Sequence, residues 1–169
     1  MSTTSTDVSF HNAPNSGRAT YSMRRPVDID HLFRDPDVVL PVMLIATQYS
    51  PFSPRESHWK LAWKVGKSST GPPVQREMYI VRNMTIHDYT NWGPITRTAE
   101  DCSKAVEITK MTLAERKRLE KIAAVIPFQG PNGKTHCQDW IIAVLEAAEQ
   151  QGLVARSEWT KAIAAVANV

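Results

Sequence analysis

Cys137 is the residue whose setting in the sequence most favours chemical reactivity. It follows a loop rich in glycine and proline (residues 129–133) and precedes apolar residues at helical spacing, including Trp140 and Val144. A thiol in the first turn of a helix faces free backbone N–H groups and the positive end of the helix dipole, and both stabilise the thiolate. We therefore predict that Cys137 is a nucleophile for acyl transfer. Cys102 lies in a polar segment without this setting and is predicted to be inert.

A cysteine nucleophile needs an imidazole partner delivered by another element. His58 is the best candidate, because it begins an aromatic-rich strand directly after a proline-rich loop. His87 competes with it, since it lies beside Asp88 in a segment without clear periodicity. The other three histidines rank lower; they are His11, His31 and His136.

A strand that begins His58-Trp59, a β-hairpin after it and a late helix that begins at Cys137 follow one another in this sequence. This order resembles the circularly permuted papain-like cysteine enzymes, which include NlpC-type peptidases, the lecithin retinol acyltransferase group and deSUMOylating-isopeptidase-like proteins. The chain is also similar to a group of small fungal proteins with a Cys-x-x-Trp helix (here residues 137–140) after a Leu-Glu-x-Ile phrase (here residues 119–122). The resemblance implies a permuted papain-like fold and a role in fungal secondary metabolism.

The same resemblance implies roles for individual residues. Cys137 would be the nucleophile and His58 the base, and a third polar residue on the next strand would orient the imidazole. That strand, predicted to include residues 78–83, holds no histidine and no acid. Asn83 or His87 is therefore the candidate for the third role.

Several side chains near these residues are candidates for contacts with a substrate. Gln48 or Tyr49, at the end of the first predicted strand, could donate a hydrogen bond to an oxyanion, together with the backbone N–H of the nucleophile. Trp59 and Gln138 are the immediate neighbours of the two catalytic candidates. Trp92, beside a Gly-Pro pair, is predicted at the rim of a pocket.

Charge and motifs argue against other classes of function. The chain carries 20 basic and 17 acidic residues, and three of its arginines lie in residues 1–26, so the remainder is close to balance. We expect no nucleic-acid partner, and the basic cluster at residues 116–118, interleaved with Glu115 and Glu120, is predicted to be a solvated helix face. The cysteines and histidines form no zinc pattern, and the glycine-rich loop lacks the Lys-Ser/Thr ending of a phosphate-binding loop. Neither a metal nor a cofactor is expected.

The elements that would position these residues follow from periodicity and turn signals. Strands come first and helices last, which indicates an α+β fold with an antiparallel sheet of about four to five strands against two to three helices. A Thr-x-x-Glu capping box (residues 112–115) marks one helix start, and Gly152 is a plausible helix end. Residues 85–101 are predicted to be an irregular loop. The predicted strands cover residues 38–49, 58–65, 75–83 and 105–110, and the predicted helices cover residues 112–125, 136–151 and 157–167.

We expect a disordered tail over residues 1–26 and a single α+β domain over residues 27–169, because the tail has few large apolar side chains. Two cysteines are too few for a disulfide framework, and no apolar run approaches the roughly 20 residues of a membrane span. A cytoplasmic protein is therefore expected.

The expected function is cysteine-dependent acyl transfer on a small biosynthetic intermediate, which could be bound to a carrier. The acyl-enzyme could lead to hydrolysis, transfer or cyclisation of an amide, ester or thioester. Two alternatives stay open: a non-catalytic binding domain with a vestigial cysteine, and a non-covalent isomerase or cyclase that uses His58 or His87 as its base. The apolar faces of the last two helices could also bury against a second copy, so a homo-oligomer stays open too.

Overall fold

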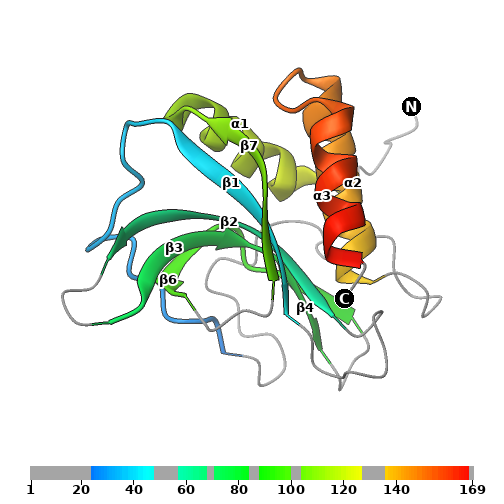
Figure 1. Cartoon of the computed structure of the whole chain (residues 1–169). Helices are drawn as coiled ribbons and strands as arrows, with labels where there is room; N and C mark the ends of the chain where they lie inside the picture. The colour runs from blue at the N-terminus through cyan, green and yellow to red at the C-terminus, as the bar shows by residue number, and fades with distance from the viewer. Residues whose placement is uncertain are drawn as a thin grey trace, which may run out of the picture.

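The main layer of the structure is a five-stranded antiparallel sheet in the order β6-β3-β2-β1-β7, with three helices packed on it (Figure 1). A second sheet contains two strands, β4 and β5. This computed structural model describes residues 24–47, 57–67, 71–83, 88–99, 104–126 and 136–167. The strands are β1 (Leu40–Thr47), β2 (His58–Lys67), β3 (Pro73–Met78), β4 (Ile80–Asn83), β5 (Asp88–Asn91), β6 (Ile95–Thr98) and β7 (Lys104–Met111). The helices are α1 (Leu113–Val125), α2 (Cys137–Gln150) and α3 (Arg156–Ala167).

The predicted α+β class with an antiparallel sheet and helices packed on it is confirmed, and two of the strand predictions are wrong. Residues 75–83 do not form one strand, because the chain leaves the main sheet at Tyr79 and continues as β4 in the smaller sheet. Residues 85–101 are not wholly irregular, since they contain β5 and β6. Both strands have four residues and include polar side chains, so neither shows the apolar alternation by which a strand is recognised in sequence.

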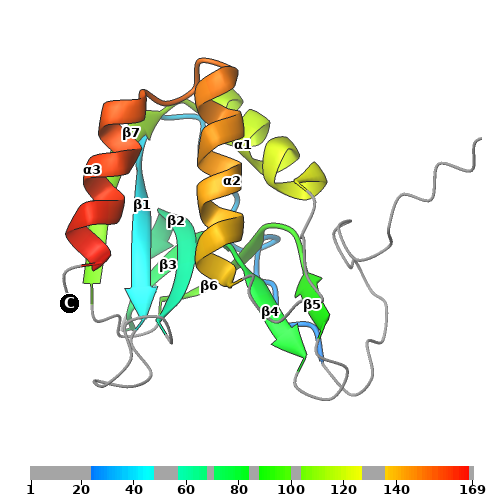
Figure 2. The ribbon, with the colours of Figure 1, turned by 90° about the vertical axis from the view of Figure 1, so that its right-hand side faces the viewer.

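Alternation along β2 divides its side chains between the two faces of the sheet. Trp59, Leu61 and Trp63 are buried in the core that the sheet shares with the helices. Figure 2 shows α2 and α3 on the same side of the main sheet, where α3 contacts β7 and β1 and α2 contacts β2. His58 and Lys60 therefore point to the other side, which we call the opposite face.

The start of α1 is fixed by the predicted capping box. The backbone N–H of Glu115 donates to the Thr112 hydroxyl at 3.3 Å, and the backbone N–H of Thr112 donates to the Glu115 carboxylate at 2.8 Å. The bond from the Thr112 backbone N–H lowers the pKa of the Glu115 carboxyl most, and a bond from the Thr112 hydroxyl to the same carboxylate at 2.8 Å lowers it further. Each of the two backbone N–H bonds satisfies an amide that the first turn of a helix leaves without a partner.

One residue of the basic cluster on α1 departs from the predicted solvated face: Arg118 is exposed, but Arg116 is not. Arg116 is fully buried and forms an ion pair with Asp35 at 2.7 Å, in the segment before β1. Its guanidinium also donates to the carbonyl oxygens of Pro36, Val38 and Met111. The guanidinium is therefore held on several sides, and it pins a segment without regular secondary structure to the first turn of α1.

The sequence also predicts a disordered tail and no membrane-spanning segment. Residues 1–23 of the predicted tail lie outside the described residues. Among the helices that are described, none is long and apolar enough to cross a membrane.

Candidate functional site

Cys137 is the first residue of α2, and its sulfur lies against the beginning of β2. The thiol donates a hydrogen bond to the Ser57 carbonyl oxygen, with 3.7 Å between the two atoms. The same carbonyl accepts from the Gln138 amide at 3.2 Å. The backbone N–H of Trp59 also bonds to the sulfur. The first turn of α2 is therefore hydrogen-bonded to the backbone of Ser57 and Trp59, the residues before and after His58.

The Cys137 thiol does not have the lowered pKa that its position at the start of a helix predicts. Burial raises the pKa of Cys137 above its ordinary value. Hydrogen bonds from the backbone N–H groups of Trp59, Gln138 and Cys137 itself lower it, but they are smaller than the effect of burial. Removal from water outweighs the favourable helix terminus, so the resting group is a neutral thiol.

This shift predicts slow alkylation of Cys137 by iodoacetamide at neutral pH. The thiolate is the reacting form, and a raised pKa lowers its fraction at any given pH, so the rate profile moves to higher pH. The measurement uses a Cys102→Ser variant, in which Cys137 is the single thiol, with N-acetylcysteine as the reference. A midpoint below that of N-acetylcysteine would contradict the shift.

His58, the predicted base, packs against Tyr79 on the opposite face. The two rings meet edge to face, with 5.3 Å between their centroids. Tyr79 directly follows β3, the strand paired with β2. The residue that contacts the imidazole from the neighbouring strand is thus an aromatic phenol, and the sequence analysis did not select it.

A buried group of charged and polar side chains continues from this ring pair. Glu77 is fully buried, and its carboxylate accepts from the Lys60 ammonium at 2.7 Å and from the Gln75 amide at 2.8 Å. The Lys60 side chain is only 3% exposed. Arg97 of β6 forms an ion pair with the same carboxylate. Charges this deeply buried require partners, and here one carboxylate holds two cations.

These residues form one connected group across three strands. The Arg97 guanidinium also lies over the Tyr79 ring, 5.7 Å from its centroid, so it links the carboxylate to the aromatic pair. His58 and Lys60 are two residues apart on β2 and share a face. We call this group the polar cluster; its members are His58, Lys60, Gln75, Glu77, Tyr79 and Arg97.

The register of the sheet explains why these residues meet. Ala62 of β2 pairs with Glu77, and Glu77 pairs with Ile95 of β6, which places the opposite-face side chains of three strands in adjacent rows. Gln75 likewise pairs with Arg97. A signal was present in the sequence, since polar residues alternate with apolar ones in the first half of β2 and three consecutive polar residues lie in β3. It could not be interpreted without the strand order.

The remaining predicted residues are placed less favourably for a site. Trp59 is 4% exposed and belongs to the helix-side core. Trp92 is 1% exposed and packs with Tyr79 and Ile95, so its prediction as a pocket rim is wrong. Both rings are large apolar groups that are buried in the hydrophobic clusters of the fold.

Asn83, one of the two candidates for the third catalytic role, is not on a strand beside His58. It ends β4 in the smaller sheet, whereas the neighbours of β2 are β3 and β1. Gln48, Tyr49 and His87 lie outside the described residues.

Within the described residues, no group of three His, Cys, Asp or Glu side chains is arranged to hold a metal ion. Comparison of the chain with protein families, curated proteins and solved structures finds no match.

Proposed function

We propose that the protein is a small-molecule enzyme that moves protons with His58 at the polar cluster, as an isomerase or cyclase without a covalent intermediate. The observation that carries this proposal is the unbroken series of contacts from the imidazole through Tyr79 and Arg97 to Glu77 and Lys60. It combines a candidate base with two cations on one face of the sheet.

The chemistry that suits this group begins with removal of a proton from a carbon next to a carbonyl. The His58 imidazole takes the proton, the C–H bond breaks, and its electron pair moves to the carbonyl oxygen. Lys60 and Arg97 stabilise the oxyanion, because opposite charge in a water-poor site acts strongly. The imidazolium then returns the proton to another carbon, which isomerises the substrate. In a cyclase, the carbanion carbon instead bonds to a second carbonyl carbon of the same molecule, the π electrons of that carbonyl move to its oxygen, and the imidazolium gives the proton to this oxygen.

The other members of the cluster have supporting roles. Glu77 fixes both cations through its two carboxylate oxygens. Tyr79 holds the His58 ring by its edge-to-face contact. Lys60 lies two residues from His58, about 7 Å along the strand, so base and cation project from the same face.

The proposal is tested by proton exchange, which requires no knowledge of the product. A panel of 1,3-dicarbonyl compounds, including N-acetylcysteamine thioesters as mimics of carrier-bound substrates, is incubated with the protein in D2O and followed by NMR. We expect at least one compound to take up deuterium much faster than it does with free imidazole at the same concentration. Exchange no faster than with imidazole across the panel would refute the proposal.

A second candidate function is acyl transfer by Cys137. It is favoured by the two hydrogen bonds of the Cys137 sulfur, to the Ser57 carbonyl and from the Trp59 backbone N–H. Ser57 and Trp59 are the residues directly before and after His58. The resemblance to permuted papain-like enzymes, which join a histidine strand to a cysteine helix, supports the same candidate. Since the resting thiol is neutral, His58 would have to turn from Tyr79 and take the thiol proton as the sulfur attacks the acyl carbon.

Intact-protein mass spectrometry separates the two candidates. Acyl transfer through Cys137 produces an acyl adduct after incubation with an aryl thioester, and the adduct disappears in Cys137→Ala. The proton-transfer proposal expects no adduct that depends on Cys137.

A further inference from the structure

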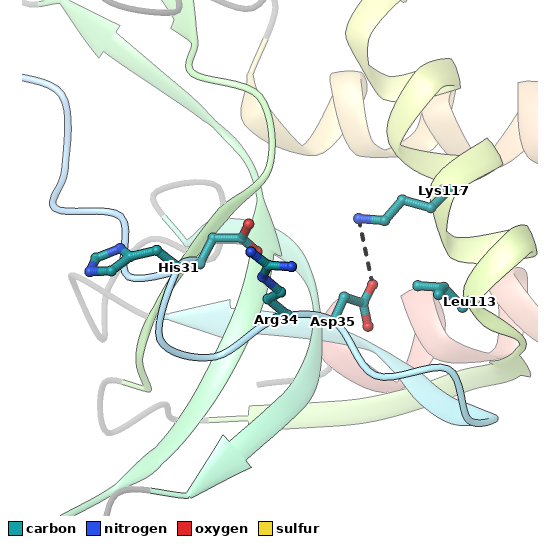
Figure 3. Close-up of a pocket in the computed structure, with 6 residues that line it drawn as sticks. His31, Arg34, Asp35, Leu113 and Lys117 are labelled. Carbon is teal, nitrogen blue, oxygen red and sulfur yellow. Dashed lines mark ion pairs between the residues drawn. The ribbon is translucent and has the colours of Figure 1, made fainter.

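A pocket of about 430 Å³ lies between α1 and the segment that precedes β1. It shares no residue with the polar cluster. Figure 3 shows its walls, which are formed by Leu113 and Lys117 of α1 and by four residues of the segment. The lining residues are Asp30, His31, Arg34, Asp35, Leu113 and Lys117.

Both carboxylates in the wall are already engaged by buried arginines. Asp30 accepts from Arg76 at 2.7 Å, and the Arg76 side chain is 10% exposed. Asp35, itself 2% exposed, accepts from Arg116 at 2.7 Å. Both aspartates therefore have a cationic partner, although the Asp30 side chain is 47% exposed and Arg76 also pairs with Glu120. The two pairs connect the segment to β3 and to α1.

The cations of the pocket are less fully engaged. Lys117 is 3.0 Å from Glu120 and 3.8 Å from Asp35, and its side chain is 42% exposed. Arg34 is exposed and forms no ion pair or hydrogen bond with any residue in the described part of the chain. In Figure 3, Arg34 and Lys117 extend toward the same space, while the His31 ring is turned away from it.

We propose that this pocket binds a small organic anion, with a carboxylate or phosphate group between Arg34 and Lys117 and an apolar part against Leu113. A guanidinium offers two parallel N–H donors to either group, and the ammonium adds a mobile point charge. The volume lies within the range of small-molecule pockets. The pairing of both aspartates leaves the Arg34 charge for the ligand.

Isothermal titration calorimetry with phenyl phosphate, benzoate and inorganic phosphate tests the proposal. We expect saturable binding of phenyl phosphate or benzoate, and the tighter of the two identifies the preferred anionic group. Arg34→Gln should weaken that binding by about 10-fold or more, the loss expected when a hydrogen bond to a charged group is removed. Lys117→Gln should weaken it as well.

Arg156→Gln is the matched control, because Arg156 is an exposed arginine at the start of α3, outside the pocket. It should leave the affinity unchanged. Leu113→Ala should weaken the binding of phenyl phosphate more than that of inorganic phosphate. The proposal is overturned if no probe binds saturably at millimolar concentration, or if Arg34→Gln and Arg156→Gln have equal effects, which would indicate general attraction of anions to a basic surface.

Discussion

Arg116→Ala is expected to lower the free energy of unfolding by about 3–5 kcal/mol, a large part of the total stability of a domain. The substitution leaves the Asp35 carboxylate, 2% exposed, with only the Lys117 ammonium at 3.8 Å as a cationic partner. It also removes the donor from the carbonyl oxygens of Pro36, Val38 and Met111. Urea unfolding followed by tryptophan fluorescence measures the change.

Arg118→Ala is the control for this prediction. Arg118 lies on the same helix but is exposed, and it donates one hydrogen bond of 3.0 Å to the Gln151 carbonyl. Its loss should cost about 1 kcal/mol or less. If Arg116→Ala does not fold, the double variant Arg116→Met/Asp35→Leu should, because removing both charges avoids an unpaired one. Equal losses for Arg116→Ala and Arg118→Ala would contradict the assigned role of the buried pair.

Lys60→Met is expected to slow deuterium uptake by the best compound of the panel by about 10²–10³-fold, the cost of removing one group that stabilises an oxyanion. The effect should fall on kcat more than on KM, since the charge it stabilises develops only in the transition state. Steady-state exchange kinetics in D2O give both constants.

Lys64→Met is the matched control for Lys60→Met, since Lys64 lies on the same strand and the same face but is exposed. It should leave both constants unchanged. The double variant Lys60→Met/Glu77→Gln removes the buried charge pair as a unit and should fold while staying slow. A Lys60→Met protein that folds and exchanges at the wild-type rate would contradict the role of the ammonium.

Local signals in the sequence predict much of the fold. β1 is a run of apolar and β-branched residues, β2 and β7 alternate in part between polar and apolar residues, and the three helices carry apolar residues at helical spacing. The Thr112–Glu115 capping box places the start of α1 because it depends on four consecutive residues. The break at Tyr79 depends instead on β5, which draws β4 into a second sheet, and no local signal marks that competition.

The site was harder to predict because its parts are distant in the sequence. Lys60 and Glu77 meet only through the register of β2 and β3, so neither is conspicuous alone. Arg116 looked like a surface residue because its partner, Asp35, is 81 residues away. For Cys137, the helix terminus was predicted, but the burial that raises its pKa depends on how α2 packs on β2.

The most direct test of the proposed function compares His58→Gln with Cys137→Ala in the deuterium-exchange assay. Loss of a base that transfers the proton should slow exchange by about 10²–10⁴-fold in His58→Gln, and Cys137→Ala should keep most of the wild-type rate. A His58→Gln protein that exchanges as fast as the wild type, while Cys137→Ala is inactive, would contradict proton transfer by His58 and favour the covalent route.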